Sequence, residues 1–120
     1  MLAARYKFSP RTVDGIFQRS FRSKKNGFSI LVLPKQDPGS KMAVVLSSSA
    51  ARTAIRRHAI KRDIYQNLEK WVQTGALDQL AEKNLTFYLI VMVVDWKTAQ
   101  LQLRTQNWTE TVEYLLQSNT

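Results

Sequence analysis

Runs of apolar residues along the chain predict three β-strands. Phe28–Leu33 and Met42–Leu46 are short and rich in apolar and β-branched residues, a composition that favours strands. Leu85–Val94 is apolar at every position except Thr86, which is typical of a central strand that is covered on both faces. Pro34–Ser40 is dense in turn-forming residues, so we expect a hairpin loop between the first two strands.

A longer apolar repeat predicts the main helix, from about Ala51 to Val72. Apolar residues recur there at helical spacing and form one continuous face: Ile60, Ile64, Leu68, Trp71 and Val72.

Three shorter helices are also predicted. Ser9–Pro10 starts the first of them, because serine caps a helix and proline fits its first position; its apolar stripe is Val13, Ile16 and Phe17. Ala76–Lys83 forms a weaker helical turn. Asn107–Gln117 begins with Asn107 and Glu110 at the spacing of a capping box.

The order α-β-β-α-β-α predicts an α+β fold in which helices pack against one sheet. No repeat, low-complexity stretch or linker divides the chain. A length of 120 residues is typical of one domain, so we expect a single domain over residues 1–120.

Composition removes several classes of function. The chain has no cysteine and one histidine, which excludes disulfide scaffolds, thiolate zinc sites and cysteine nucleophiles. The N-terminal segment Met1–Lys7 lacks the apolar core of a signal peptide, and Leu85–Val94 is about half the length of a membrane span. We therefore expect a soluble, cytoplasmic protein with no membrane partner.

The charge is large and uneven. The net charge is +9, which indicates a polyanionic partner. Residues 1–70 hold 15 Lys and Arg against 4 Asp and Glu, whereas residues 71–120 hold 3 against 5. The first part of the chain is therefore expected to face the polyanion, and the second part to act mostly as scaffold.

The positive charge gathers on the main helix. No acid occurs between Lys41 and Asp63, so the usual pairing of Lys or Arg with Glu one turn away is missing. Such a helix suits a phosphate backbone. The candidate RNA-binding residues are Arg52, Arg56, Arg57, His58, Lys61, Arg62 and Tyr65.

Other interpretations of the same residues stay open. The basic helix is also compatible with a solvated surface or an anionic membrane surface. A self-sufficient nuclease would use His58 with either Asp63 or Asp95. A histidine that acts as a general acid or base needs a partner that orients it, and Asp63 is the first acid near His58 in the sequence. A second loop cluster either extends the electrostatic footprint or is simply solvated: Arg19, Arg22, Lys24 and Lys25.

The chain resembles the bacterial ribonuclease P protein. That family has a basic helix of the form R-N-R-x-K-R, and the segment from Arg57 to Arg62 reads R-H-A-I-K-R, with His58 and Ala59 replacing the Asn and the second Arg. Phe17 and Phe28 keep the family spacing between the first helix and the first strand, and Val13 takes the position of another aromatic. The resemblance extends from about Phe8 to Gln117.

The resemblance implies a fold, partners and a second site. The implied fold is an α-β sandwich with a left-handed crossover before the basic helix, like the second domain of ribosomal protein S5. The implied partners are ribonuclease P RNA, which performs hydrolysis with Mg²⁺, and precursor tRNA, with no obligatory protein partner and no cofactor bound by the chain alone. The single-stranded 5′ leader would lie in a cleft lined by Val13, Phe17, Phe28 and Leu31. Val13, Phe17 and Phe28 are also compatible with plain core packing.

Two functions follow from these features. The first is the non-catalytic protein subunit of the endoribonuclease ribonuclease P, acting in tRNA 5′-end maturation. The alternative is a structural RNA-binding protein of ribosomal type, which would use the same basic helix without a role in tRNA processing.

Overall fold

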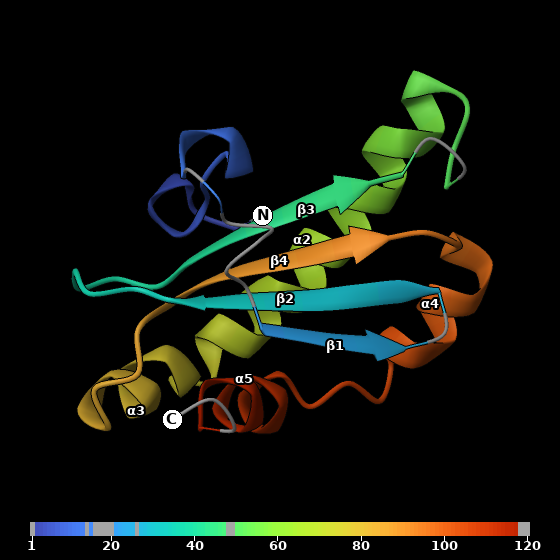
Figure 1. Ribbon diagram of the computed structural model, residues 1–120. Helices are drawn as coiled ribbons and strands as arrows, with labels where there is room; N and C mark the ends of the chain where they lie inside the picture. The colour runs from blue at the N-terminus through green and yellow to red at the C-terminus, as the bar shows by residue number, and fades with distance from the viewer. Residues whose placement is uncertain (1, 14, 16–20, 26, 48–49, 118–120) are drawn as a thin grey trace.

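The computed structural model describes residues 2–13, 15, 21–25, 27–47 and 50–117, which build one mixed sheet with helices along it (Figure 1). The sheet has the strand order β1-β2-β4-β3. Its strands are β1 (Phe21–Lys25), β2 (Phe28–Pro34), β3 (Lys41–Leu46) and β4 (Phe87–Val93). β2 runs antiparallel to β1 and β4, whereas β3 runs parallel to β4.

The last strand in the sequence therefore lies between two earlier ones, and the predicted hairpin between β2 and β3 is wrong. Residues 35–40 carry the chain past the start of β4 to its far side. Lys35 N–H donates to the Thr86 carbonyl at 2.8 Å, and the Thr86 hydroxyl donates back to the Lys35 carbonyl at 2.6 Å. The turn-forming residues make a turn, but its two strands are not neighbours.

The hairpin occurs instead between β1 and β2, around Asn26-Gly27 in the sequence. Gly27 has φ +91°, and a Cβ there would lie 2.5 Å from the Ala99 nitrogen and 2.6 Å from the Asp95 carbonyl oxygen. The Gly27 carbonyl accepts hydrogen bonds from the N–H groups of Val94 and Asp95. The turn is thus pressed directly against the backbone that follows β4, which only a glycine allows.

The connection from β3 to β4 contains α2 (Ala54–Gln73) and α3 (Ala76–Glu82). In Figure 1 both strands point to the right, β3 lies above β4, and α2 passes behind the sheet. This arrangement makes the crossover left-handed, as the resemblance implied, whereas crossovers between parallel strands are right-handed in about 98% of cases.

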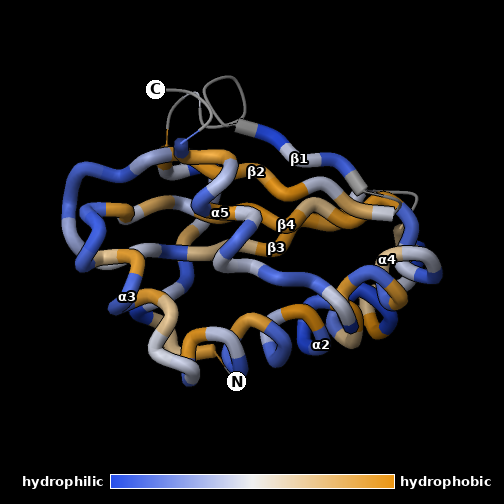
Figure 2. Tube along the Cα trace, turned by 90° about the horizontal axis from the view of Figure 1, so that it is seen from below, coloured by the Kyte–Doolittle hydropathy of each residue, from blue (hydrophilic) through white to orange (hydrophobic). Residues whose placement is uncertain are grey.

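The main core lies between the sheet and the helices. It joins alternate residues of β2, such as Phe28 and Ile30, to the buried stripe of α2 and to two further helices, α4 (Trp96–Leu103) and α5 (Trp108–Gln117). Figure 2 shows the apolar strands as one curved layer with the helices on one side of it. We call this side of the sheet the helix face.

The other side, which we call the second face, has a smaller core. Leu31, Leu33, Ala43 and Ile90 are buried there. Val13 and Phe8 of the N-terminal segment pack on them, and the backbone of that segment reaches the sheet where Phe8 N–H donates to the Met42 carbonyl at 3.2 Å. The expectation that β4 is covered on both faces is confirmed, because its residues contribute to both cores.

The predicted helices agree with the structure in part. The long helix begins at Ala54, capped by the Thr53 hydroxyl, and the weak turn is α3. Asn107 caps α5 by accepting from Glu110 N–H at 3.0 Å. The first predicted helix is described only as a single 3₁₀ turn, Pro10–Thr12, and Ile16 and Phe17 lie outside the described residues.

Three elements were not predicted, the 3₁₀ turn Ala4–Tyr6, β1 and α4, so the observed order differs from the predicted one. The α+β class and the packing of helices on one sheet are confirmed. Within the described part of the chain, no helix is both long and apolar enough to cross a lipid bilayer.

Candidate nucleic-acid interface

The first half of α2 presents its charge outward because its apolar stripe holds the opposite side on the sheet. Ile60, Ile64 and Leu68 are each at most 1% exposed. No acid lies in the first turn of the helix, where the N-terminal end of the helix dipole adds to the positive charge of the side chains.

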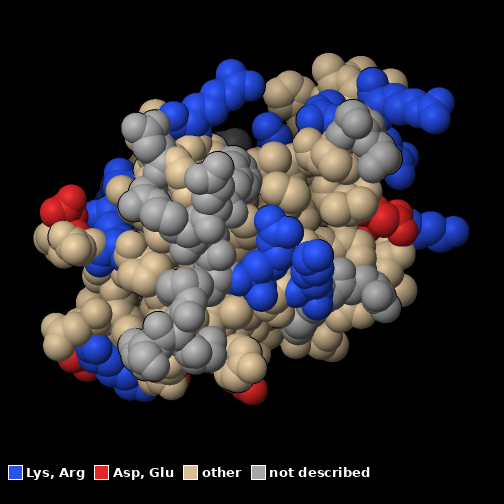
Figure 3. Space-filling view, viewed as in Figure 1, with Lys and Arg blue, Asp and Glu red and all other residues tan. Residues whose placement is uncertain are grey.

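Five of the predicted RNA-binding residues lie on or beside this outer surface. Arg52, Arg56, His58 and Arg62 are exposed, and Lys61 is partly buried. Figure 3 shows Lys and Arg side chains gathered at the upper right, over the start of α2. Of these side chains, Arg62 has an acidic neighbour, the Asp63 carboxylate, with Nε and Oδ1 3.6 Å apart.

Arg57 has a different position from the one predicted. Its guanidinium turns away from the exposed arc and donates three hydrogen bonds to main-chain carbonyls, those of Leu46 at 3.2 Å, Ser47 at 3.3 Å and Ala51 at 3.1 Å. Three residues before Ile60, it lies close to the buried side of the helix. The physical consequence is that Arg57 ties the end of β3 and the following loop to α2.

The Tyr65 hydroxyl also contacts the edge of the sheet. β3 is an edge strand, and the N–H of Val44 donates to the Tyr65 hydroxyl at 3.3 Å. Burial raises the pKa of the Tyr65 phenol above its ordinary value, and the hydrogen bond from Val44 opposes this in part. The Lys7 ammonium lies 4.6 Å from the centre of the Tyr65 ring, a cation–π contact that brings the N-terminal segment to the basic helix.

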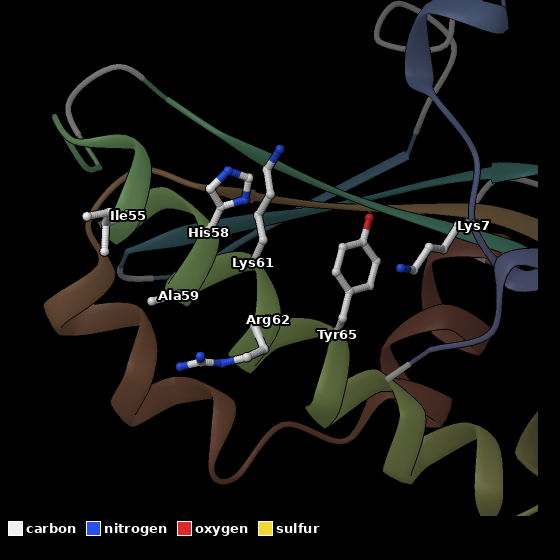
Figure 4. Close-up of a pocket in the computed structure, with 7 residues that line it drawn as sticks. All are labelled: Lys7, Ile55, His58, Ala59, Lys61, Arg62 and Tyr65. Carbon is white, nitrogen blue, oxygen red and sulfur yellow. The ribbon is translucent and has the colours of Figure 1, made fainter.

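A hollow of about 580 Å³ runs along the outer side of α2. It is lined by Lys7 and Tyr65 at one end and by residues of α2 from Ile55 to Arg62 along its length. In Figure 4 the side chains of His58 and Lys61 point to one side of the helix and that of Arg62 to another, with Ala59 between them. The hollow therefore has basic groups on both sides.

The predicted leader cleft is divided between the two faces of the sheet. Leu31 and Val13 share the second face. Phe28 does not, because it is 2% exposed in the core beneath the helices, and its inclusion in one cleft with Leu31 is wrong. Successive residues of a strand point to opposite faces, so positions 28 and 31 cannot share one. Phe17 lies outside the described residues.

The strand register places on the second face two cations that were predicted to lie in a loop, and the loop prediction is wrong for them because they belong to β1. Arg22 pairs with Leu31, and Lys24 pairs with Ser29, and directly paired residues of antiparallel strands point to the same face. Cations on β1 therefore border the apolar centre of this face. The same register argument across β4 and β3 places Tyr88, Met92 and Lys41 there.

Tyr88 contacts both an aromatic ring and a cation on the second face. Its ring centre lies 4.8 Å from that of Phe8 and 5.7 Å from the Lys35 ammonium. No sequence signal distinguishes Tyr88 from its neighbours, because β4 is apolar on both faces and only its register shows which side each residue takes.

The two carboxylates of the nuclease hypothesis each have another neighbour. Asp63 lies beside Arg62, and Asp95 accepts a hydrogen bond from the Thr98 hydroxyl at 2.6 Å, next to the start of α4. Among the residues that the structure describes, no three His, Asp or Glu side chains are grouped so that they could hold a metal ion.

Comparison with solved structures identifies the fold. The chain is similar to the Staphylococcus aureus RNase P protein, with a TM-score of 0.59 and 16% sequence identity over 96% of this chain and 95% of that one. A mutant of the same protein with defective mRNA degradation activity also matches, with a TM-score of 0.59 and 16% identity over 95% of this chain and 87% of that one. No protein-family model and no curated protein sequence matches the chain.

Proposed function

We propose that this chain is the protein subunit of a ribonuclease P, which binds the catalytic RNA and assists removal of the 5′ leader from precursor tRNA. The observation that carries the proposal is the coincidence of two features. The fold matches a ribonuclease P protein over nearly the full length of both chains, and the helix that bears the family-like basic segment is the one whose cations face outward.

The outer surface of α2 is the proposed contact with ribonuclease P RNA. Lysine and arginine side chains displace counterions from RNA phosphates, which makes affinity depend steeply on salt. The proposed contact residues are Arg52, Arg56, His58, Lys61 and Arg62. Arg57 and Tyr65 act differently in this proposal, because their polar groups hold the β3 edge and thereby position the helix.

The second face of the sheet is the proposed site for the leader. The buried Leu31 lies beneath its apolar centre, which the partly buried Val13 helps to form, and Arg22, Lys24 and Lys41 lie toward its edges. Unpaired bases bind apolar and aromatic surfaces with little sequence selection, while cations follow the backbone. Tyr88 and Met92 therefore join the proposed leader site, and Phe28 leaves it.

The chemistry of hydrolysis is assigned in this proposal to the RNA, with Mg²⁺, and not to the protein. The part of the protein in this proposal is to bind and position the RNA. A subunit of a tRNA-processing enzyme would act in the cytoplasm.

Reconstitution tests the proposal directly. Purified protein, its cognate ribonuclease P RNA and a precursor tRNA are combined at low Mg²⁺, and cleavage is followed with and without protein. Stimulation of cleavage supports the proposal. Its absence, together with recovery of ribosomal RNA after crosslinking and sequencing of the bound RNA, would favour a structural RNA-binding protein of ribosomal type.

A further inference from the structure

One large apolar side chain, that of Ile55, is exposed among the basic residues of α2. Ile55 is 85% exposed, the highest value among the large apolar side chains of the described residues. Single exposed apolar residues are common on protein surfaces. Ile55 differs because it lines the hollow along α2 together with Ala59, one turn further on.

The lining of the hollow combines two chemistries. Ile55 and Ala59 give it an apolar floor, and the basic groups beside them are His58, Lys61 and Arg62. Among the described residues that line it, none is acidic. Its volume of about 580 Å³ falls within the range of about 300–1,000 Å³ that is typical of pockets for small ligands.

A paired RNA duplex does not satisfy both chemistries. Its bases are stacked inside the helix, and it offers phosphates and ribose hydroxyls at its surface. Such a surface would place polar groups against Ile55 and leave the apolar floor unmatched. An unpaired nucleotide presents a flat base and a phosphate on each side, which is the combination that this lining suits.

We propose that the hollow on α2 receives one unpaired nucleotide of the bound RNA, with its base against Ile55 and Ala59. Its flanking phosphates lie toward Lys61 and His58 on one side and toward Arg62 on the other. The inference rests on the proposed function and deepens it, because it predicts that α2 distinguishes an interrupted RNA helix from a continuous one.

The experiment compares two RNA probes, a short duplex and the same duplex with one unpaired adenosine at its centre. Binding is measured by fluorescence anisotropy for the unaltered protein, Ile55→Asn and the apolar replacement Ile55→Leu. Leu101→Asn is the matched control, because Leu101 is 63% exposed on α4 and does not line the hollow.

We expect the unaltered protein to bind the interrupted duplex about fivefold or more tightly, because the base covers the exposed side chain of Ile55 and removes apolar surface from water. Ile55→Leu and Leu101→Asn should keep this preference. Ile55→Asn should lose it and retain the salt dependence of binding, since no charge is removed.

Equal affinity of the unaltered protein for the two probes would overturn the inference, as would a preference that survives in Ile55→Asn. Either result leaves the proposed function standing if both probes bind with a steep salt dependence. Failure of the protein to bind either probe, together with no stimulation of cleavage in the reconstitution, would refute both.

Discussion

The Arg57 guanidinium donates from Nη2 to the Leu46 carbonyl at 3.2 Å, and so joins the basic helix to the last residue of β3. A cation that the sequence places in an RNA-binding cluster is used to close a loop. The consequence is that two neighbouring basic residues of α2, Arg57 and Lys61, should respond to mutation in different ways.

Arg57→Ala should lower the free energy of unfolding by about 2 kcal/mol or more, because it removes three hydrogen bonds that the guanidinium donates to main-chain carbonyls. Urea unfolding measures the change. Arg57→Lys should recover only part of the loss, since an ammonium cannot reproduce the planar fork of the guanidinium. Unchanged stability in Arg57→Ala would contradict the positioning role.

Lys61→Ala should leave stability nearly unchanged and weaken RNA binding by about 1 kcal/mol, with the slope of log affinity against log salt reduced by about one unit. Binding titrations at several salt concentrations measure both quantities. Lys83→Ala is the control, because Lys83 lies beyond the end of α3 beside Glu113. An equal change of slope in both variants would place Lys61 outside the interface.

Tyr65→Phe should cost about 1–2 kcal/mol of stability, because the N–H of Val44 loses its acceptor in a partly buried position. The exposed Tyr114 offers a matched control, and Tyr114→Phe should have little effect. A loss of the same size in both variants would show that the hydrogen bond to Val44 contributes nothing.

The same variant predicts a difference in pH dependence. The pKa of Tyr65 is raised in the folded protein, so its contribution to stability is fully present below the ordinary value of about 10. It falls as the pH rises through that value toward the folded pKa, because the unfolded chain releases the proton first. The unaltered protein should therefore lose stability more steeply than Tyr65→Phe above about pH 10.

Gly27→Ala should destabilise the fold by several times as much as Gly39→Ala. Both glycines have a φ near +90°, so both substitutions incur the backbone strain of about 1 kcal/mol that this region imposes. Only at Gly27 would the new Cβ also meet backbone atoms, those of Asp95 and Ala99, whereas nothing lies within 4 Å of the position at Gly39. Thermal unfolding of the two variants isolates this contact, and equal shifts would contradict it.

Elements held by local chemistry could be predicted from the sequence. The apolar repeat of α2 and the Asn107 cap of α5 depend on residues three or four positions apart, and the structure confirms both. The β1–β2 hairpin could also have been predicted, because the sequence Asn26-Gly27 is a strong signal for a tight turn. It was missed because the short strand before it is basic.

The pairing of β4 could not be predicted in this way. Nothing in residues 34–40 shows that the strand arriving beside β2 comes from residue 87 onward, since that choice depends on how the whole sheet buries its two faces. In the candidate site, too, some features could be predicted from local sequence and others could not. The outward cations of α2 follow from helix geometry, whereas the role of Arg57 depends on a loop that no periodicity describes.

The central position of β4 also sets the order in which the parts of the protein can fold during synthesis. β2 and β3 do not pair with each other, and the strand that lies between them begins only at Phe87. On a translating ribosome, the basic helix therefore emerges well before the sheet that it packs on can close. Pairing over such sequence distances slows folding, so the growing chain exposes unpaired strands and a strongly cationic segment together, surrounded by ribosomal RNA.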